Sequence, residues 1–199
     1  MKKEQAVGKE LFFSLLVLVI VMILFSQFVQ FIELRPGVQL NDFILNSFKA
    51  RDLTWPIFMM IYGAILGALG ILIFYPERLV ILFQAYTLMV LIRMLLMYLV
   101  ALDPPADMLL LKDPLVEFFG GTKTLTRDLF FSGHTASLTL LALAVPKKVK
   151  WFFFTLTALV AISVLWQKVH YTIDVLAAPL VSYFCYYMTS RMHKKLIDE

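Results

Sequence analysis

The chain is poor in cysteine and in charge. It has one cysteine among 199 residues, so no disulfide can form within the chain, and the redox compartment cannot be read from it. Only 16% of the residues are charged, whereas soluble domains usually carry about 25%. The net charge of +4 is small and the basic residues are scattered along the chain, which argues against a nucleic-acid partner.

Apolar residues fill the chain instead. They make up 61% of it, aromatic residues 15%, and the mean hydropathy is +0.83. A transmembrane helix needs about 20 mostly apolar residues, and the sequence offers several such stretches. The first follows Lys2, Lys3 and Lys9 as a signal peptide would, but it is too long and lacks a small-residue cleavage site. We therefore expect a polytopic membrane protein.

Breaks that contain proline or charge divide the apolar stretches into six predicted spans. The breaks are "ELRPGVQLND", "YPER", "LDPPAD", "VPKKVK" and, least clearly, "QKVHYT". The predicted fold class is all-α, a bundle of six transmembrane helices in one domain over residues 1–199. The spans cover residues 11–31, 53–74, 79–101, 129–145, 151–167 and 171–189.

Six spans place both termini on one face of the membrane. That face holds ten basic residues and the other seven, so the positive-inside rule predicts cytoplasmic termini. His193 and the basic residues of the C-terminal tail are expected at the surface, against anionic lipids. His134 and His170 then share the opposite, extracytoplasmic face.

His170 and Asp174 are four residues apart, so they lie on one face of the last predicted helix. A carboxylate bonded to one imidazole nitrogen fixes the tautomer and leaves the other nitrogen to act as a nucleophile or base. Ionisable groups in apolar spans are costly and commonly mark function.

The tripeptide Ser132, Gly133 and His134 opens another predicted helix. Free N–H groups at such a terminus bind phosphate oxygens, and glycine permits close approach. His134 could give a proton to the group leaving phosphorus while His170 attacks from the other side. Either histidine alone is more commonly an interface residue. Two on the same face predict a catalytic site.

Three basic residues could bind the same phosphate. Arg93 lies deep in the third span, where its guanidinium would match a phosphodiester, or would form a buried ion pair with Asp103 or Asp128. Arg127 and Lys168 could share this role or be solvated rim charges.

Two histidines and an aspartate could also hold a metal ion. Asp174 is better placed to support His170 than to act as a third ligand, and no cysteine or paired carboxylate lies nearby in the sequence. We predict neither a metal nor a cofactor.

Three motifs in order resemble the sphingomyelin synthase branch of the type 2 phosphatidic acid phosphatase superfamily. The motif of form RxxxMYxxxLxxP starts at Arg93, "RDLFFSGHTASLTL" supplies Asp128, and "HYTIDV" starts at His170. These core motifs lie within residues 93–175. The phosphatases carry an arginine after a serine before the second histidine, but here Val164 follows Ser163, which favours the synthase branch.

The resemblance implies a six-helix bundle, with the site facing the lumen or periplasm. It gives His134, His170 and Asp174 the roles of the catalytic triad. Arg93, Ser132, Gly133, Arg127, Lys168 and Asp128 are the predicted phosphate-binding residues.

The predicted function is transfer of a phospho-headgroup from a phospholipid to a lipid alcohol, such as ceramide or diacylglycerol, through a phosphohistidine. With water as acceptor, the same residues would make a lipid phosphatase or a phospholipase C. A membrane transporter or scaffold is the non-enzymatic alternative. The sequence leaves the headgroup, the acceptor and the oligomeric state open.

Overall fold

The computed structural model describes residues 2–113 and 125–198, and these form helices and irregular segments without a strand. One isolated β-bridge joins Val38 and Leu102. The all-helical class is thereby confirmed for the described residues. The helices are α1 (Lys2–Glu33), α2 (Phe43–Asn46), α3 (Thr54–Leu72), α4 (Pro76–Leu99), α6 (Gly133–Ala144), α7 (Lys147–Trp166) and α8 (Thr172–Asp198).

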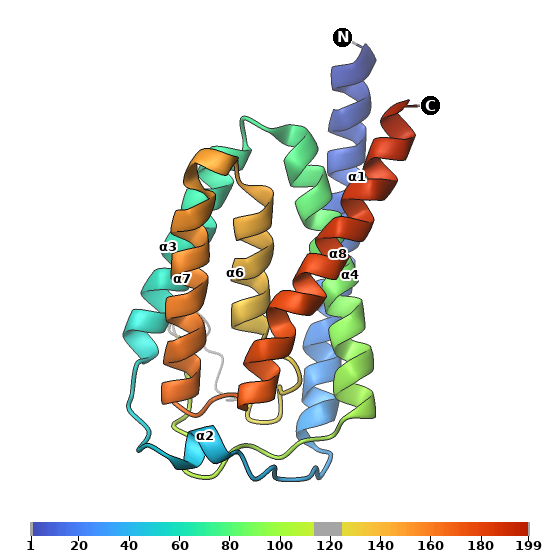
Figure 1. Ribbon diagram of the computed structural model, residues 1–199. Helices are drawn as coiled ribbons and strands as arrows, with labels where there is room; N and C mark the ends of the chain where they lie inside the picture. Colours follow the sequence, from blue (N-terminus) through green and yellow to red (C-terminus); the bar gives the residue numbers. More distant parts are fainter. Residues whose placement is uncertain (1, 114–124, 199) are drawn as a thin grey trace.

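Helix α6 is the centre of the bundle. It packs against α3, α4, α7 and α8, while α1 packs along α4 (Figure 1). Side chains from Thr135 to Val145 are buried, apart from the half-buried Ser137. Small residues at Ala136, Ala142 and Ala144 are fully buried and let the neighbouring helices come close.

Within the described part of the chain, four helices are long and apolar enough to cross a membrane, namely α1 from Gln5 onward, α3, α4 and α7. Large apolar side chains point outward from them, with Trp151 81% and Leu66 72% exposed, as lipid-facing residues would be. Several apolar helices therefore indicate a membrane-embedded protein. All six predicted spans fall on helices, but α6 has only 12 residues, so the number of crossings stays a prediction.

The fourth span was predicted from residue 129, yet α6 begins at Gly133. The reason is local, because the Ser132 hydroxyl oxygen accepts a hydrogen bond from the Thr135 N–H and caps the helix. Residues before the cap form an irregular segment that lies across the end of the bundle.

Both chain ends lie at the same end of the bundle, together with the turns from α3 to α4 and from α6 to α7 (Figure 1). Helix α2, the first residues of α6 and the junction of α7 with α8 lie at the opposite end. His134 and His170 belong to this second end, far from the termini.

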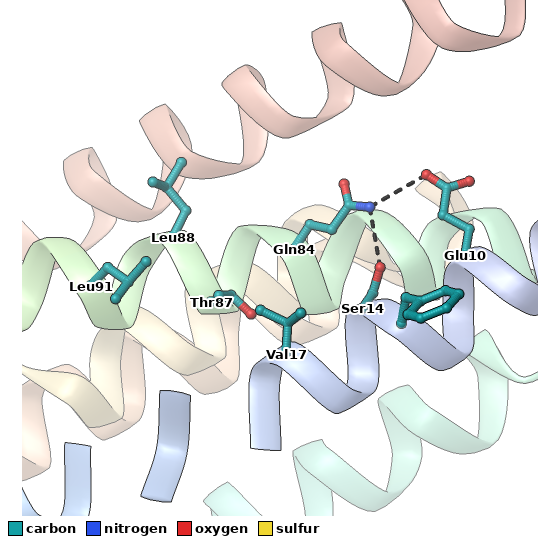
Figure 2. A pocket seen from close by; sticks show the side chains of 8 residues that line it. Glu10, Ser14, Val17, Gln84, Thr87, Leu88 and Leu91 are labelled. Carbon is teal, nitrogen blue, oxygen red and sulfur yellow. Dashed lines mark hydrogen bonds between the residues drawn. The ribbon is translucent and has the colours of Figure 1, made fainter. Parts of the chain in front are cut away.

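The prediction for His193 was wrong. We expected it at the surface, but it is 4% exposed, and its Nδ1 lies 3.3 Å from the Glu10 Oε1. Glu10 and Ser14 of α1 also accept hydrogen bonds from the Gln84 side chain of α4, as Figure 2 shows. Helix α8 continues through the charged tail, and the side of it that carries His193 packs toward α1.

Candidate active site

The turn after α7 brings His170 to the start of α8. Lys168 adopts a left-handed conformation, with φ of 57°, and its N–H donates to the Leu165 carbonyl. The Val169 N–H donates to the Val164 carbonyl, which completes a Schellman motif and reverses the chain. His170 follows at once, before α8 begins at Thr172.

Asp174 lies in the first turn of α8 and faces His170. Its Oδ2 is 3.4 Å from the His170 Nδ1 and also accepts the Tyr171 N–H at 3.1 Å. Asp174 is fully buried and His170 is 2% exposed, so their interaction is shielded from water. With Nδ1 turned toward the carboxylate, Nε2 is the nitrogen left for chemistry.

His134 approaches His170 from a different helix. The two ring centroids are 6.1 Å apart, with an interplanar angle of 63°. The Phe58 ring of α3 packs edge-on against His134, also at 6.1 Å. Residues 36 positions apart in the sequence thus meet at one end of the bundle, where a small group could lie against both rings.

Arg93 binds the segment that precedes α6. Its Nε donates to the Phe131 carbonyl at 2.9 Å, and one terminal nitrogen lies 2.9 Å from the Asp128 Oδ1. The guanidinium lies against Gly133, where an added Cβ would be 2.9 Å from the Arg93 Cζ. Arg93 is therefore in the ion pair with Asp128 that the sequence allowed, and it touches the helix terminus.

A cavity of about 630 Å³ leads to this group of residues. Its polar end is lined by Arg93, Asp128, Gly133, His134 and Asp113. The rest is mostly apolar, with walls from α1, α3, α4 and α6. A cavity with an apolar body and a charged end fits an amphipathic ligand.

Arg127 and Lys168 lie outside the lining of this cavity. The Arg127 Nε donates to Asp103 Oδ1 at 2.7 Å, and its backbone N–H donates to Glu33. The Lys168 Nζ lies 3.9 Å from the Asp107 carboxylate. These contacts join loops at the site end, and phosphate binding by either residue stays a prediction.

Several polar contacts near the site were not predicted from the sequence. Asp42 accepts hydrogen bonds from both the N–H and the hydroxyl of Thr172, at 2.7 and 3.1 Å. Within the cavity, Tyr62 donates to Asp113, and Tyr86 is hydrogen bonded to a serine of α6. Single polar residues in loops or helices carry no local signal of such long-range contacts.

Among residues 2–113 and 125–198, no group of three or more His, Cys, Asp and Glu side chains is arranged to hold a metal ion. What the site does present is a helical membrane bundle in which the His134 imidazole and the Arg93 guanidinium line one end of an apolar cavity. His170 and Asp174 are buried next to His134 but lie outside the cavity lining. That combination is suited to chemistry on an anionic amphiphile.

Residues 127–191 match the family model described as PAP2 superfamily C-terminal. The matched segment contains His134, His170 and Asp174. The match supports a place in the type 2 phosphatidic acid phosphatase superfamily, and with it a phosphatase- or phosphotransferase-type lipid enzyme. No curated protein matches the chain significantly.

Proposed function

We propose that the protein is a membrane lipid phosphotransferase of the sphingomyelin synthase type, acting through a phosphohistidine without a metal. The observation that carries the proposal is the 6.1 Å separation of the His134 and His170 rings, with Asp174 behind His170. One catalytic domain over residues 1–199 would do this work at the extracytoplasmic face.

In the first step the His170 Nε2 attacks phosphorus, and the bond from phosphorus to the oxygen of the lipid alcohol breaks. His134 gives its proton to that oxygen, so the alcohol leaves neutral. The headgroup phosphate stays bonded to His170, whose positive charge the Asp174 carboxylate stabilises.

In the second step His134 takes the proton from the hydroxyl of an acceptor. The acceptor oxygen bonds to phosphorus, the bond to His170 Nε2 breaks, and the histidine returns to its neutral form. Arg93 and the α6 terminus at Ser132 and Gly133 stabilise the extra negative charge in both transition states.

Hydrolysis is the second candidate function, and the polar end of the cavity supports it. Asp113, Asp128 and Arg93 give water polar partners there, and water in place of a lipid alcohol would make the same residues a phosphatase or phospholipase C. The identity of the acceptor, and not the histidines, separates the two functions.

The deciding experiment uses the full-length protein, purified in detergent, with phospholipids labelled in the headgroup. Each is incubated with and without ceramide or diacylglycerol, with and without EDTA, and with His170→Ala as the inactive control. A labelled lipid product that requires the acceptor supports transfer, and release of label into water supports hydrolysis. Full activity of His170→Ala contradicts both.

A further inference from the structure

Two hydroxyl groups interrupt the apolar walls of the cavity just beyond His134. Tyr86 of α4 and Ser137 of α6 both line it, and their oxygens are 3.1 Å apart. Ser137 follows His134 by three residues, so the two side chains share a helix face with a rise of about 4.5 Å between them. The pair therefore lies close to the reacting phosphorus in our proposed function.

The Ser137 hydroxyl bonds to another helix, as the Ser14 and Ser182 hydroxyls also do. Thr87, Thr139 and Thr157 each donate to the carbonyl four residues earlier in their own helix. Ser137 instead faces a hydroxyl on another helix, across the wall of the cavity. The Ser137 hydroxyl therefore lies at the cavity wall, bonded to Tyr86 and not to its own helix backbone.

The pair retains one hydrogen for a ligand. Two hydroxyls contain two donor hydrogens, and the bond between Tyr86 and Ser137 uses one of them. Neither residue makes another side-chain hydrogen bond within the described parts of the chain. In an apolar cavity, a free hydroxyl hydrogen is stabilised when a ligand supplies an acceptor oxygen.

The rest of the cavity has the dimensions of one acyl chain. Along α4 it reaches from Arg93 to Leu82, eleven residues or about 16 Å. This is about half of the 30 Å hydrocarbon core, that is, one leaflet. At about 30 Å³ for each water-sized group, 630 Å³ holds about 20 such groups, which suits one chain with a headgroup.

In a phospholipid or a ceramide, a carbonyl stands between the head and the acyl chain. We propose that Tyr86 and Ser137 donate a hydrogen bond to this ester or amide carbonyl and so set the depth of the lipid relative to His134. This inference rests on the proposed function. Tyr86 and Ser137 are then residues that determine specificity, because they favour lipids with an acyl linkage over lipids with an alkyl linkage.

The test compares diacyl phosphatidylcholine with its dialkyl ether analogue, which lacks the carbonyls, at a fixed ceramide concentration. A second arm compares ceramide with an N-alkyl analogue at a fixed donor. In one of the two arms, we expect the wild type to have a kcat/KM about three- to tenfold higher for the carbonyl lipid than for its analogue. The arm that shows this preference identifies the lipid that occupies the cavity.

The double variant Tyr86→Phe/Ser137→Ala should lose this preference because its rate on the carbonyl lipid falls while its rate on the analogue is kept. Each single variant retains one hydroxyl and should lose only part, which provides a test if the double variant does not fold. Tyr183→Phe, on the outward side of α8 and 59% exposed, is the matched control.

Activity in the double variant with the preference intact, or a wild type indifferent to the carbonyl in both arms, would overturn the inference. Absence of activity on every phospholipid would instead count against the proposed function. The two failures are therefore distinguishable.

Discussion

Gly133 occupies a position where the next larger side chain collides with Arg93. A Cβ there would lie 2.9 Å from both the Cζ and one terminal nitrogen of the guanidinium. We expect Gly133→Ala to displace Arg93 from Asp128 and to lower kcat/KM by roughly 10²-fold, the usual cost of a displacement near 1 Å. Steady-state kinetics on the labelled phospholipid measure this.

Gly63→Ala is the control for that prediction. Gly63 also lies in a helix, and beyond its chain neighbours and the adjacent helix backbone no described atom is within 4 Å of its added Cβ. Its kinetics should match the wild type. Equal activity of Gly63→Ala and Gly133→Ala would show that the position of Arg93 does not matter to the reaction.

Asp103 links the end of α4 to the segment before α6. The hydrogen bond from Arg127 lowers the pKa of Asp103, and the Gly37 N–H adds to this. A lowered pKa in the folded state stabilises the fold above the unfolded value of about 3.9, and this contribution is lost as the pH falls through the folded pKa.

Asp103→Asn should therefore lower the Tm at pH 7 but not below the folded pKa of Asp103. Thermal unfolding in detergent at both pH values measures the difference. Arg127→Gln should lower the Tm at pH 7 similarly, and the double variant should lose less than the sum of the two. A deficit of Asp103→Asn that is the same at both pH values would exclude the ion pair as its cause.

At the scale of elements, α2 and α8 meet through one carboxylate. Asp42 caps α2 by accepting from Ile44 and Leu45, and it also accepts from Thr172, the first residue of α8. Burial tends to raise the pKa of Asp42, but the hydrogen bonds from Thr172 and α2 bring it below its usual value. His170 is two residues before Thr172.

We expect Asp42→Ala to cost about 1–2 kcal/mol of stability, as other lost helix caps do. Because α8 also carries Asp174, the variant should lower kcat more than it raises KM. Thr172→Val, which keeps the backbone N–H, should have a smaller effect on both. A variant that loses stability but keeps the wild-type kcat would show that Asp42 does not position His170.

The sequence predicted the helices well because apolar length is a local property. Residues 11–31 lie within α1, and the predicted spans 53–74 and 79–101 overlap α3 and α4 with ends that differ by one to three residues. The Ser132 cap explains why α6 begins later than expected. The spacing of His170 and Asp174 was also local, so their pairing could be predicted.

Contacts between distant residues could not be predicted in the same way. Asp42 and Thr172 are 130 residues apart, and Tyr86 and Ser137 are 51 apart. Only the packing of separate helices brings such pairs together. The prediction for His193 was wrong for a related reason, since the charges around it gave no sign that α8 continues and brings His193 beside Glu10 of α1.

At the scale of the whole molecule, the bundle has two unlike ends. Both termini lie at one end, and the start of α6 and the junction of α7 with α8, which carry His134 and His170, lie at the other (Figure 1). The positive-inside rule predicts that the termini are cytoplasmic. The active site would then act on the extracytoplasmic leaflet.

Cysteine labelling with a membrane-impermeant reagent measures this orientation. In a Cys185→Ser background, Asn41→Cys at the site end should be labelled in intact cells. Lys148→Cys at the other end should be labelled only after permeabilisation. The reverse pattern would place the active site in the cytoplasm.

The central claim is that His170 carries the phospho-headgroup between donor and acceptor. The most direct measurement is rapid quenching of the enzyme with phospholipid labelled at phosphorus, without acceptor, followed by peptide mapping. We expect a label on His170 that is stable in base and lost in acid, and that is absent from His170→Ala. A label on another residue, or turnover by His170→Ala at the wild-type rate, would contradict it.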